Sequence, residues 1–177
     1  MDKFTITSLK KQLGQKTKAE LIEEIALLCK TFPQVKEYYQ AQGANIQDIA
    51  KKYKDLIQKE FIGSKTRPPQ ARASVARKAL NDFKKLTNEP DLIADVMMTY
   101  VESLVAFNTE YAPDVEDYYV RAENMFETVL ALIQKHQMTE QFQLRAYDVM
   151  KYATEGWGHQ ESLEERYQEI YDRRDHV

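Results

Sequence analysis

The stretch PDLIADVMMTYVESLVAFNTEY, residues 90–111, is the longest part of the chain that follows one helical period without a break. When its residues are placed 100° apart, the apolar side chains gather on one broad face. Asp91, Asp95 and Glu102 share the opposite face, where we expect solvent to surround them. The stretch therefore predicts a long helix with one buried side. That side consists of Leu92, Ile93, Val96, Met97, Tyr100, Val101, Leu104, Phe107 and Tyr111.

The same period recurs on both sides of this stretch, and no segment shows the alternation of a strand. We predict an all-α fold with about eight or nine helices in one domain, residues 1–177. The helices are expected as stacked antiparallel hairpins, arranged either as a helical repeat or as an irregular bundle. Asn45 is expected to cap the third predicted helix. The predicted helices cover about 17–31, 33–43, 45–63, 71–86, 90–111, 114–137, 139–153 and 160–172.

The first predicted helix carries the clearest start signal in the chain. Thr17 and Glu20 have the spacing of a capping box, in which each side chain satisfies a backbone N–H of the other residue. Thr17 should therefore cap a helix that runs to about residue 31. Leu21, Ile25 and Leu28 recur at helical spacing along it, and we predict that they form its buried stripe.

Two segments 80 residues apart resemble each other. LIEEIALLCKTFPQVKEYY, residues 21–39, matches VESLVAFNTEYAPDVEDYY, residues 101–119, at several apolar positions, at one proline and at a pair of tyrosines. Both segments predict a helix, a proline junction and a second helix. This pattern indicates a duplicated helical hairpin, over about 17–43 and 91–137, and hence stacked helix pairs. Chance similarity between amphipathic helices is the alternative.

The composition indicates an ordered protein of a reducing compartment, which we take to be the cytoplasm. The chain of 177 residues has a single cysteine, so no disulfide can form within it. Cys29 follows two leucines and is predicted to be a buried structural thiol. No apolar run reaches the length of a signal peptide or of the ~20 residues that cross a membrane.

Charge is unevenly distributed along the chain. The net charge is −3, but residues 51–85 hold 11 basic and 3 acidic side chains, a net of +8. Residues 86–177 hold 7 basic and 19 acidic side chains, a net of −12. Such asymmetry is typical of a phosphate or nucleic-acid partner, or of two parts that attract each other. The segment lacks the interleaved aromatic residues that stack on bases, so a solvated face is the simpler interpretation.

The basic candidates for anion binding lie on the predicted helix 71–86. The apolar residues of this helix share one side, and four cations lie away from it and could meet phosphates. Arg72 is different because it falls within the apolar stripe. Its long stem either covers the edge of the core, or its guanidinium forms half of a buried pair with a carboxylate. The candidates are Arg72, Arg77, Lys78, Lys84 and Lys85.

The familiar catalytic and cofactor motifs are absent from the sequence. The histidines His136, His159 and His176 stand far apart, and none belongs to HExxH or follows a glutamate by three residues. The chain contains no P-loop, no GxGxxG and no GxSxG. We therefore predict no metal, no cofactor and no catalytic residue. An enzyme whose site is assembled from distant residues is the remaining alternative.

The stretch EGWGHQES, residues 155–162, contains the only tryptophan of the chain. We predict that it is a turn between two helices, in which Gly156 adopts the left-handed conformation that closes a helix. Trp157 should then pack back on the preceding helix and pin the last one. The alternative is a ligand site in which Trp157 stacks on a ligand beside His159.

Four stretches together resemble a known protein family. They are VKEYY at 35–39, SVARKALNDFKKL at 74–86, DLIADVMMTYVESLVAFNTEY at 91–111 and EGWGHQESLEERYQEIY at 155–171. The chain is similar here to a family of small bacterial all-helical proteins of unknown function, and the EGWG-type motif is the most specific element. The resemblance implies a bacterial cytoplasmic protein with one helical domain. It implies no activity, cofactor or catalytic residue.

These observations favour a protein that binds another protein, or a second copy of itself, without catalysing a reaction. Stacked helix pairs present grooves and end surfaces that serve recognition. Binding of a phosphate or a nucleic acid through residues 51–85 is the alternative function. The sequence predicts no membrane partner.

Overall fold

The computed structural model describes residues 4–43, 46–64 and 66–172. This part of the chain contains nine α-helices, and its one β-bridge joins Ser64 to Arg67 within a loop. The all-α prediction is therefore confirmed. The chain divides into two compact units, residues 1–44 and 45–177, which we describe one at a time. Because compact units of this kind can belong to one domain, the single domain stays a prediction.

The N-terminal unit, described here for residues 4–43, contains three helices. They are α1 (Ile6–Leu13), α2 (Lys18–Thr31) and α3 (Pro33–Gly43). The predicted capping box at the start of α2 is confirmed, because the Glu20 N–H donates to the Thr17 hydroxyl at 3.2 Å and the Thr17 N–H donates to the Glu20 carboxylate at 2.7 Å. Local sequence therefore defines where α2 begins.

The predicted buried stripe of α2 is wrong. Leu21 and Ile25 are only half-buried, and Leu28 is 39% exposed. Cys29, predicted to be buried, is half-buried as well. No residue of α1 or α2 is fully buried, and Ala41 in α3 is the one buried apolar residue described in this unit. Short helices in so small a unit offer too little surface to enclose one another's apolar faces.

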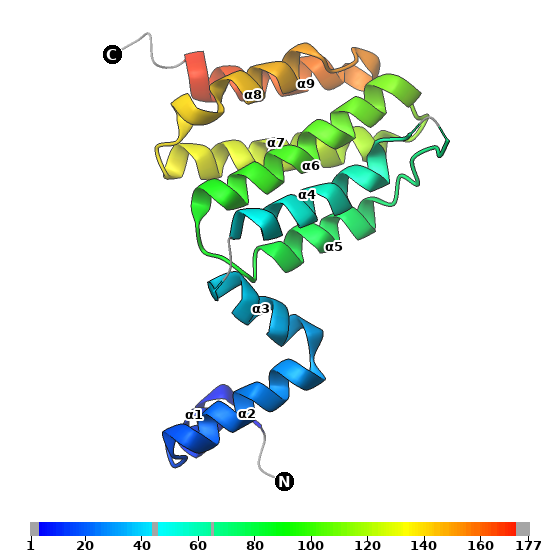
Figure 1. Cartoon of the computed structure of the whole chain (residues 1–177). Helices are drawn as coiled ribbons and strands as arrows, with labels where there is room; N and C mark the ends of the chain where they lie inside the picture. The colour runs from blue at the N-terminus through cyan, green and yellow to red at the C-terminus, as the bar shows by residue number, and fades with distance from the viewer. Residues whose placement is uncertain (1–3, 44–45, 65, 173–177) are drawn as a thin grey trace. The chain divides into compact units, whose positions relative to one another are not determined.

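The second unit, described here for residues 46–64 and 66–172, is called the helical stack. Its helices pair in chain order, α4 with α5, α6 with α7 and α8 with α9, and the members of each pair run antiparallel (Figure 1). The pair α6 and α7 lies in the middle, with α4 packed on α6 and α9 packed on α7. The predicted stacked hairpins are confirmed. The helices are α4 (Ile46–Phe61), α5 (Ala73–Phe83), α6 (Pro90–Tyr111), α7 (Glu116–Lys135), α8 (Thr139–Lys151) and α9 (His159–Tyr171).

Helix α6 forms the centre of the core. It begins and ends where the sequence predicts, and its predicted apolar face is buried except for the half-buried Ile93 and for Tyr111, which is 43% exposed. Ala94, Met98 and Ser103 are also buried, although they lie outside the predicted face. The reason is that α4, α5, α7 and α8 all contact α6. A helix with neighbours on several sides buries more than one stripe.

Backbone conformation explains where two helices of the stack start. Ala71 has a left-handed φ of 54°, so α5 begins at residue 73 and not at 71 as predicted. Ala112 has a φ of 39° and ends α6, and α7 begins three residues after Pro113.

Pro33, in contrast, is itself the first residue of α3. The two proline junctions thus differ in detail, and the duplication stays a prediction. Asn45 lies outside the described residues.

Candidate functional site

Arg72 forms an ion pair with Glu60 at the end of α4. Its Nε and Nη2 donate to the two carboxylate oxygens at 2.9 and 2.7 Å. The Glu60 side chain is 7% exposed and the Arg72 side chain is 56% exposed. Arg72 thus pairs with a carboxylate, as one of its two predicted roles requires, but the predicted burial holds for Glu60 only. Hydrogen bonds from Arg72 lower the pKa of the Glu60 carboxyl, outweighing burial, which acts to raise it.

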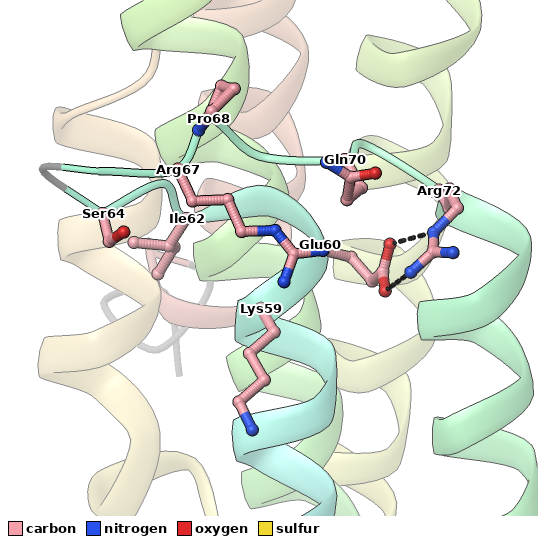
Figure 2. A pocket seen from close by; sticks show the side chains of 8 residues that line it. All are labelled: Lys59, Glu60, Ile62, Ser64, Arg67, Pro68, Gln70 and Arg72. Atoms are coloured by element: carbon pink, nitrogen blue, oxygen red, sulfur yellow. Dashed lines mark hydrogen bonds and ion pairs between the residues drawn. The ribbon is translucent and has the colours of Figure 1, made fainter.

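A pocket of about 260 Å³ lies beside this ion pair. Figure 2 shows the Arg67 side chain extending from the loop toward Glu60, with Lys59 on the same helix as Glu60. Three cations thus line the pocket against one carboxylate, and both oxygens of that carboxylate are bonded to Arg72. This excess of positive charge suits an anionic group. The lining residues are Lys59, Glu60, Ile62, Ser64, Arg67, Pro68, Gln70 and Arg72.

The loop that carries Arg67 is fixed by short-range and long-range contacts. The backbones of Ser64 and Arg67 exchange hydrogen bonds of 2.7 and 3.2 Å. A Cβ atom at Gly63 would lie 3.0 Å from Pro69 Cδ and 3.1 Å from the Tyr111 hydroxyl, so the loop packs closely at this glycine. The pocket wall is therefore built into the fold.

The other predicted anion-binding residues have different surroundings. Lys78 and Lys85 both donate to Asp82, at 2.6 and 2.8 Å, so these two cations share one carboxylate. Arg77 is exposed, and Lys84 is half-buried beside an apolar groove. The structure therefore brings Arg72 into the pocket beside Glu60 and leaves the other four candidates outside its lining. Lys65, also in the basic segment, lies outside the described residues.

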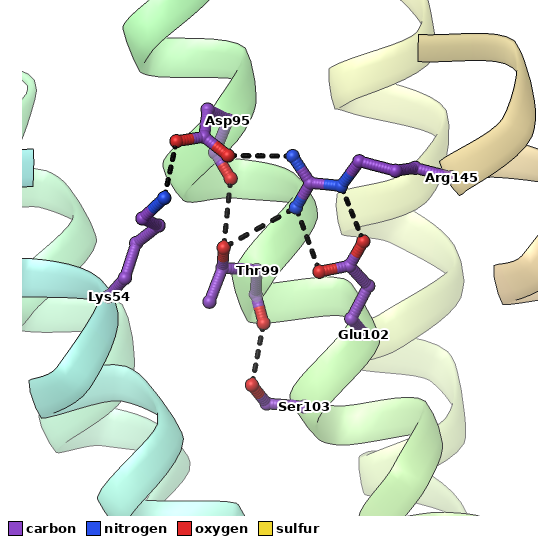
Figure 3. Close-up of polar contacts among 6 residues, drawn as sticks. All are labelled: Lys54, Asp95, Thr99, Glu102, Ser103 and Arg145. Carbon is purple, nitrogen blue, oxygen red and sulfur yellow. Dashed lines mark hydrogen bonds and ion pairs between the residues drawn. The ribbon is translucent and has the colours of Figure 1, made fainter. Parts of the chain in front are cut away.

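A second group of charges crosses the stack between α4, α6 and α8 (Figure 3). Arg145 donates to Asp95 at 2.6 Å and to the two oxygens of Glu102 at 2.7 and 2.8 Å. Lys54 donates to the other oxygen of Asp95 at 2.7 Å. Burial acts to lower the pKa of Arg145, but hydrogen bonds and charge from Glu102 and Asp95 raise it overall.

Basic side chains of other helices pair with both carboxylates, so the prediction of a solvated face is wrong for Asp95, which is 25% exposed, whereas Glu102 stays 37% exposed. Sequence reasoning missed Arg145, although one signal was present. Arg145 lies among Phe142, Ala146 and Val149, which are buried members of α8. A charged residue within an apolar stripe is the same signal that singled out Arg72.

The stretch EGWGHQES forms a turn between α8 and α9, as predicted, but with different roles for its residues. Gly156 is not left-handed; instead Trp157 and Gly158 have φ values of 59° and 67°. Trp157 is 57% exposed, and the centroid of its ring lies 6.2 Å from that of Tyr119 on α7. The prediction of a left-handed Gly156 is therefore wrong, whereas the prediction that Trp157 pins the last helix stays a prediction.

His159, the first residue of α9, makes the buried contact in this turn. It is fully buried, and its Nδ1 lies 2.7 Å from a carboxylate oxygen of Glu123 on α7. The Ser162 hydroxyl donates to the other oxygen at 2.9 Å. Burial acts to raise the pKa of the Glu123 carboxyl, but hydrogen bonds from His159 and Ser162 lower it overall. A charged Glu123 therefore joins α9 to α7 through His159 and Ser162, and the ligand site at Trp157 and His159 stays the alternative prediction.

Within residues 4–43, 46–64 and 66–172, no three His, Cys, Asp or Glu side chains converge in a way that could hold a metal ion. In the same residues, no helix combines the length and the apolar character needed to cross a membrane.

Comparison with known proteins places the chain in a family. No curated protein and no solved structure matches it. One family, described as "Family of unknown function (DUF6155)", matches residues 4–175, which is nearly the whole chain. The structure supplies the all-α fold that the resemblance implies. The chain therefore belongs to this family of unknown function.

Proposed function

We propose that this protein is a non-enzymatic helical module that binds another protein through its N-terminal unit. The supporting observation is the number of large apolar side chains that this unit exposes. Within residues 4–43, only Ala41 is a buried apolar residue. The exposed ones are Phe4, Ile6, Ile22, Leu27, Leu28, Phe32, Tyr38 and Tyr39.

The positions of the exposed apolar side chains around α2 indicate that a single neighbouring helix could not cover all of them. Ile22 and Leu27 are 55% and 63% exposed. Five residues apart on a helix, they lie about 140° from each other, so α2 exposes apolar groups on two sides. Soluble proteins rarely expose large contiguous apolar patches unless these serve as binding surfaces. A unit of about 40 residues also needs support beyond its own core, which an apolar protein surface would supply.

A pair of surface variants tests this proposal. Ile22→Glu with Leu27→Glu should abolish capture of a partner from host lysate, because charge on this surface opposes apolar contact. The matched control is Leu144→Glu, which changes a 72% exposed leucine on α8 of the stack. We expect the control to capture the same partner, identified by mass spectrometry, as the unmodified chain.

Sedimentation velocity on the purified chain shows whether the partner is a second copy. The proposal is wrong if the double variant and the unmodified chain capture the same proteins and sediment alike. We further propose that the protein works in the cytoplasm of a bacterium, as its family resemblance implies. The lysate for the capture experiment should therefore come from a bacterial host.

Binding of an anion through the basic segment is the second candidate function. The pocket lined by Lys59, Arg67 and Arg72 supports it, because its cations outnumber its carboxylate. Retention on immobilised nucleic acid should fall steeply as salt rises, and Arg67→Glu should reduce it. Lys78→Glu should have less effect, because Lys78 already pairs with Asp82. Retention that ignores salt, or that Arg67→Glu leaves unchanged, would exclude this function.

A further inference from the structure

A second hollow in the helical stack has different chemistry from the pocket beside Glu60. It is a groove of about 340 Å³ at the end of the stack where α5 and α7 finish and α6 begins. Figure 1 shows these three helix ends on the same side of the stack. Its lining is almost entirely apolar apart from two lysines, and it includes no carboxylate. The lining residues are Lys84, Ile93, Met97, Thr128, Ala131, Leu132 and Lys135.

The two lysines place positive charge at the rim of this apolar groove. Lys84 follows the last residue of α5, and Lys135 is the last residue of α7. Thr128 adds little polarity, because its hydroxyl donates at 2.6 Å to the Asn124 carbonyl of its own helix. The groove therefore combines an apolar floor with a cationic edge.

Lys84 differs in its surroundings from Lys78 and Lys85, its neighbours in the chain. Lys78 and Lys85 pair with Asp82, whereas no carboxylate among the described residues is recorded as a partner of Lys84. Burial, and after it the positive charge of Arg77, lower the pKa of the Lys84 ammonium. A half-buried cation without a counter-charge is destabilised, and an anion bound at the groove would supply that charge.

We propose that this groove binds a medium-chain aliphatic carboxylate. The carboxylate pairs with Lys84 and Lys135, and the chain lies on Ile93, Met97 and Leu132. Charge complementarity selects the anionic head, since the rim holds cations only. The groove, at about 340 Å³, is near the lower end of the roughly 300–1,000 Å³ range of small-molecule pockets, which suits a small ligand.

Calorimetric titration with butanoate, hexanoate, octanoate and decanoate, each below its micelle concentration, tests the proposal on the unmodified chain. Each added CH₂ should tighten binding about threefold to fourfold until the groove is filled. Octanol, which has the same chain length and no charge, should bind at least about tenfold more weakly than octanoate. Absent binding, affinity that is independent of chain length, or equal affinity for octanol and octanoate would each overturn the proposal.

Variants locate the site. Lys84→Met keeps the apolar stem and removes the charge, so it should weaken octanoate binding at least about fivefold, whereas Lys84→Arg should retain most of it. Ala131→Trp adds bulk at an exposed groove position and should abolish binding without opening a cavity in the core. Lys78→Met is the matched control outside the groove lining and should bind as the unmodified chain does. Octanoate binding that Lys84→Met and Ala131→Trp leave unchanged, in variants with unmodified circular dichroism, would place the ligand elsewhere and overturn the proposal.

Discussion

The N-terminal unit and the helical stack form their helices by different means. In the N-terminal unit, α1 and α2 both begin with complete capping boxes, at Thr5 and Thr17, yet neither helix contains a buried residue. In the stack, none of the helices α5 to α9 has a side-chain cap, yet each contains several buried residues. A helix can thus be stabilised by its own first turn or by its neighbours.

This difference affects how each region should respond to change. A capping box contributes about 1 kcal/mol to one helix, and isolated helices of 8 to 14 residues, such as α1 and α2, are marginal in water. Burial of large side chains contributes more and couples several helices together. We therefore expect the stack to determine global stability, and the N-terminal unit to tolerate substitution while remaining available for binding.

The largest difference is expected between two leucine-to-alanine substitutions. Leu104 in α6 is fully buried, whereas Leu27 in α2 is 63% exposed. Leu104→Ala should lower the free energy of unfolding by about 2–5 kcal/mol, because it removes buried methyl groups and leaves a cavity. Leu27→Ala should change it by less than about 0.5 kcal/mol. Chemical denaturation followed by circular dichroism measures both, and equal effects would break the comparison.

The turn before α9 tests burial within the stack itself. His159→Ala removes the fully buried partner of Glu123 and should cost about 1–3 kcal/mol of unfolding free energy. Trp157→Ala should cost less than about 1 kcal/mol, because Trp157 is 57% exposed. Thermal unfolding of the two variants ranks them. A larger loss from Trp157→Ala would identify tryptophan as the residue that anchors α9.

Ion pairs in the two regions should also differ in strength. Arg145→Met leaves Asp95 and Glu102 without their main partner and should cost about 1–2 kcal/mol, less than a fully buried pair, because the side chain of Arg145 is 32% exposed. Lys16→Met breaks the pair with Glu24, whose side chains are 39% and 38% exposed, and should cost at most about 0.5 kcal/mol. Urea denaturation at low and high salt separates them, and a larger cost for Lys16→Met would contradict the comparison.

The smallest expected effect is a dependence on pH. The pKa of Glu60 lies below its ordinary value of 4.5 in the folded protein, so the unfolded chain binds more protons in the interval between the two values. The stability from the Arg72 pair is therefore fully present above pH about 4.5, and it is lost as the pH falls through the folded pKa.

Glu60→Gln should flatten the loss of stability on acidification below pH about 4.5. Glu20→Gln, which removes an exposed carboxylate with a lowered pKa in the capping box of α2, should flatten it less, because solvent screens that site. Urea denaturation at a series of pH values from 7 to 3 measures both slopes. A steeper loss of stability with acid in Glu60→Gln would show that protonation of Glu60 does not destabilise the folded protein.

Single residues show what the sequence could predict about the candidate sites. Arg72 was recognisable because a charge within an apolar stripe needs a partner, but nothing near it identified Glu60, 12 residues earlier across a loop. Arg145 carried the same signal and was missed, since its partners are 43 and 50 residues away in the chain. The groove beside Lys84 had no local signal, because three helices contribute its lining.

By itself, the sequence determined the all-α class, most helix boundaries and the turn at EGWGHQES. Capping residues, prolines and helical periodicity involve residues within one or two helical turns of each other. The sequence alone therefore contains all the information that these signals need. Only the tertiary structure decided which faces are buried. The leucine stripe of α2 was expected to be buried and is partly exposed, whereas Asp95 on the acidic face of α6 was expected to be solvated and is largely covered. Burial and charge pairing depend on which helices become neighbours, and distant parts of the chain supply those neighbours.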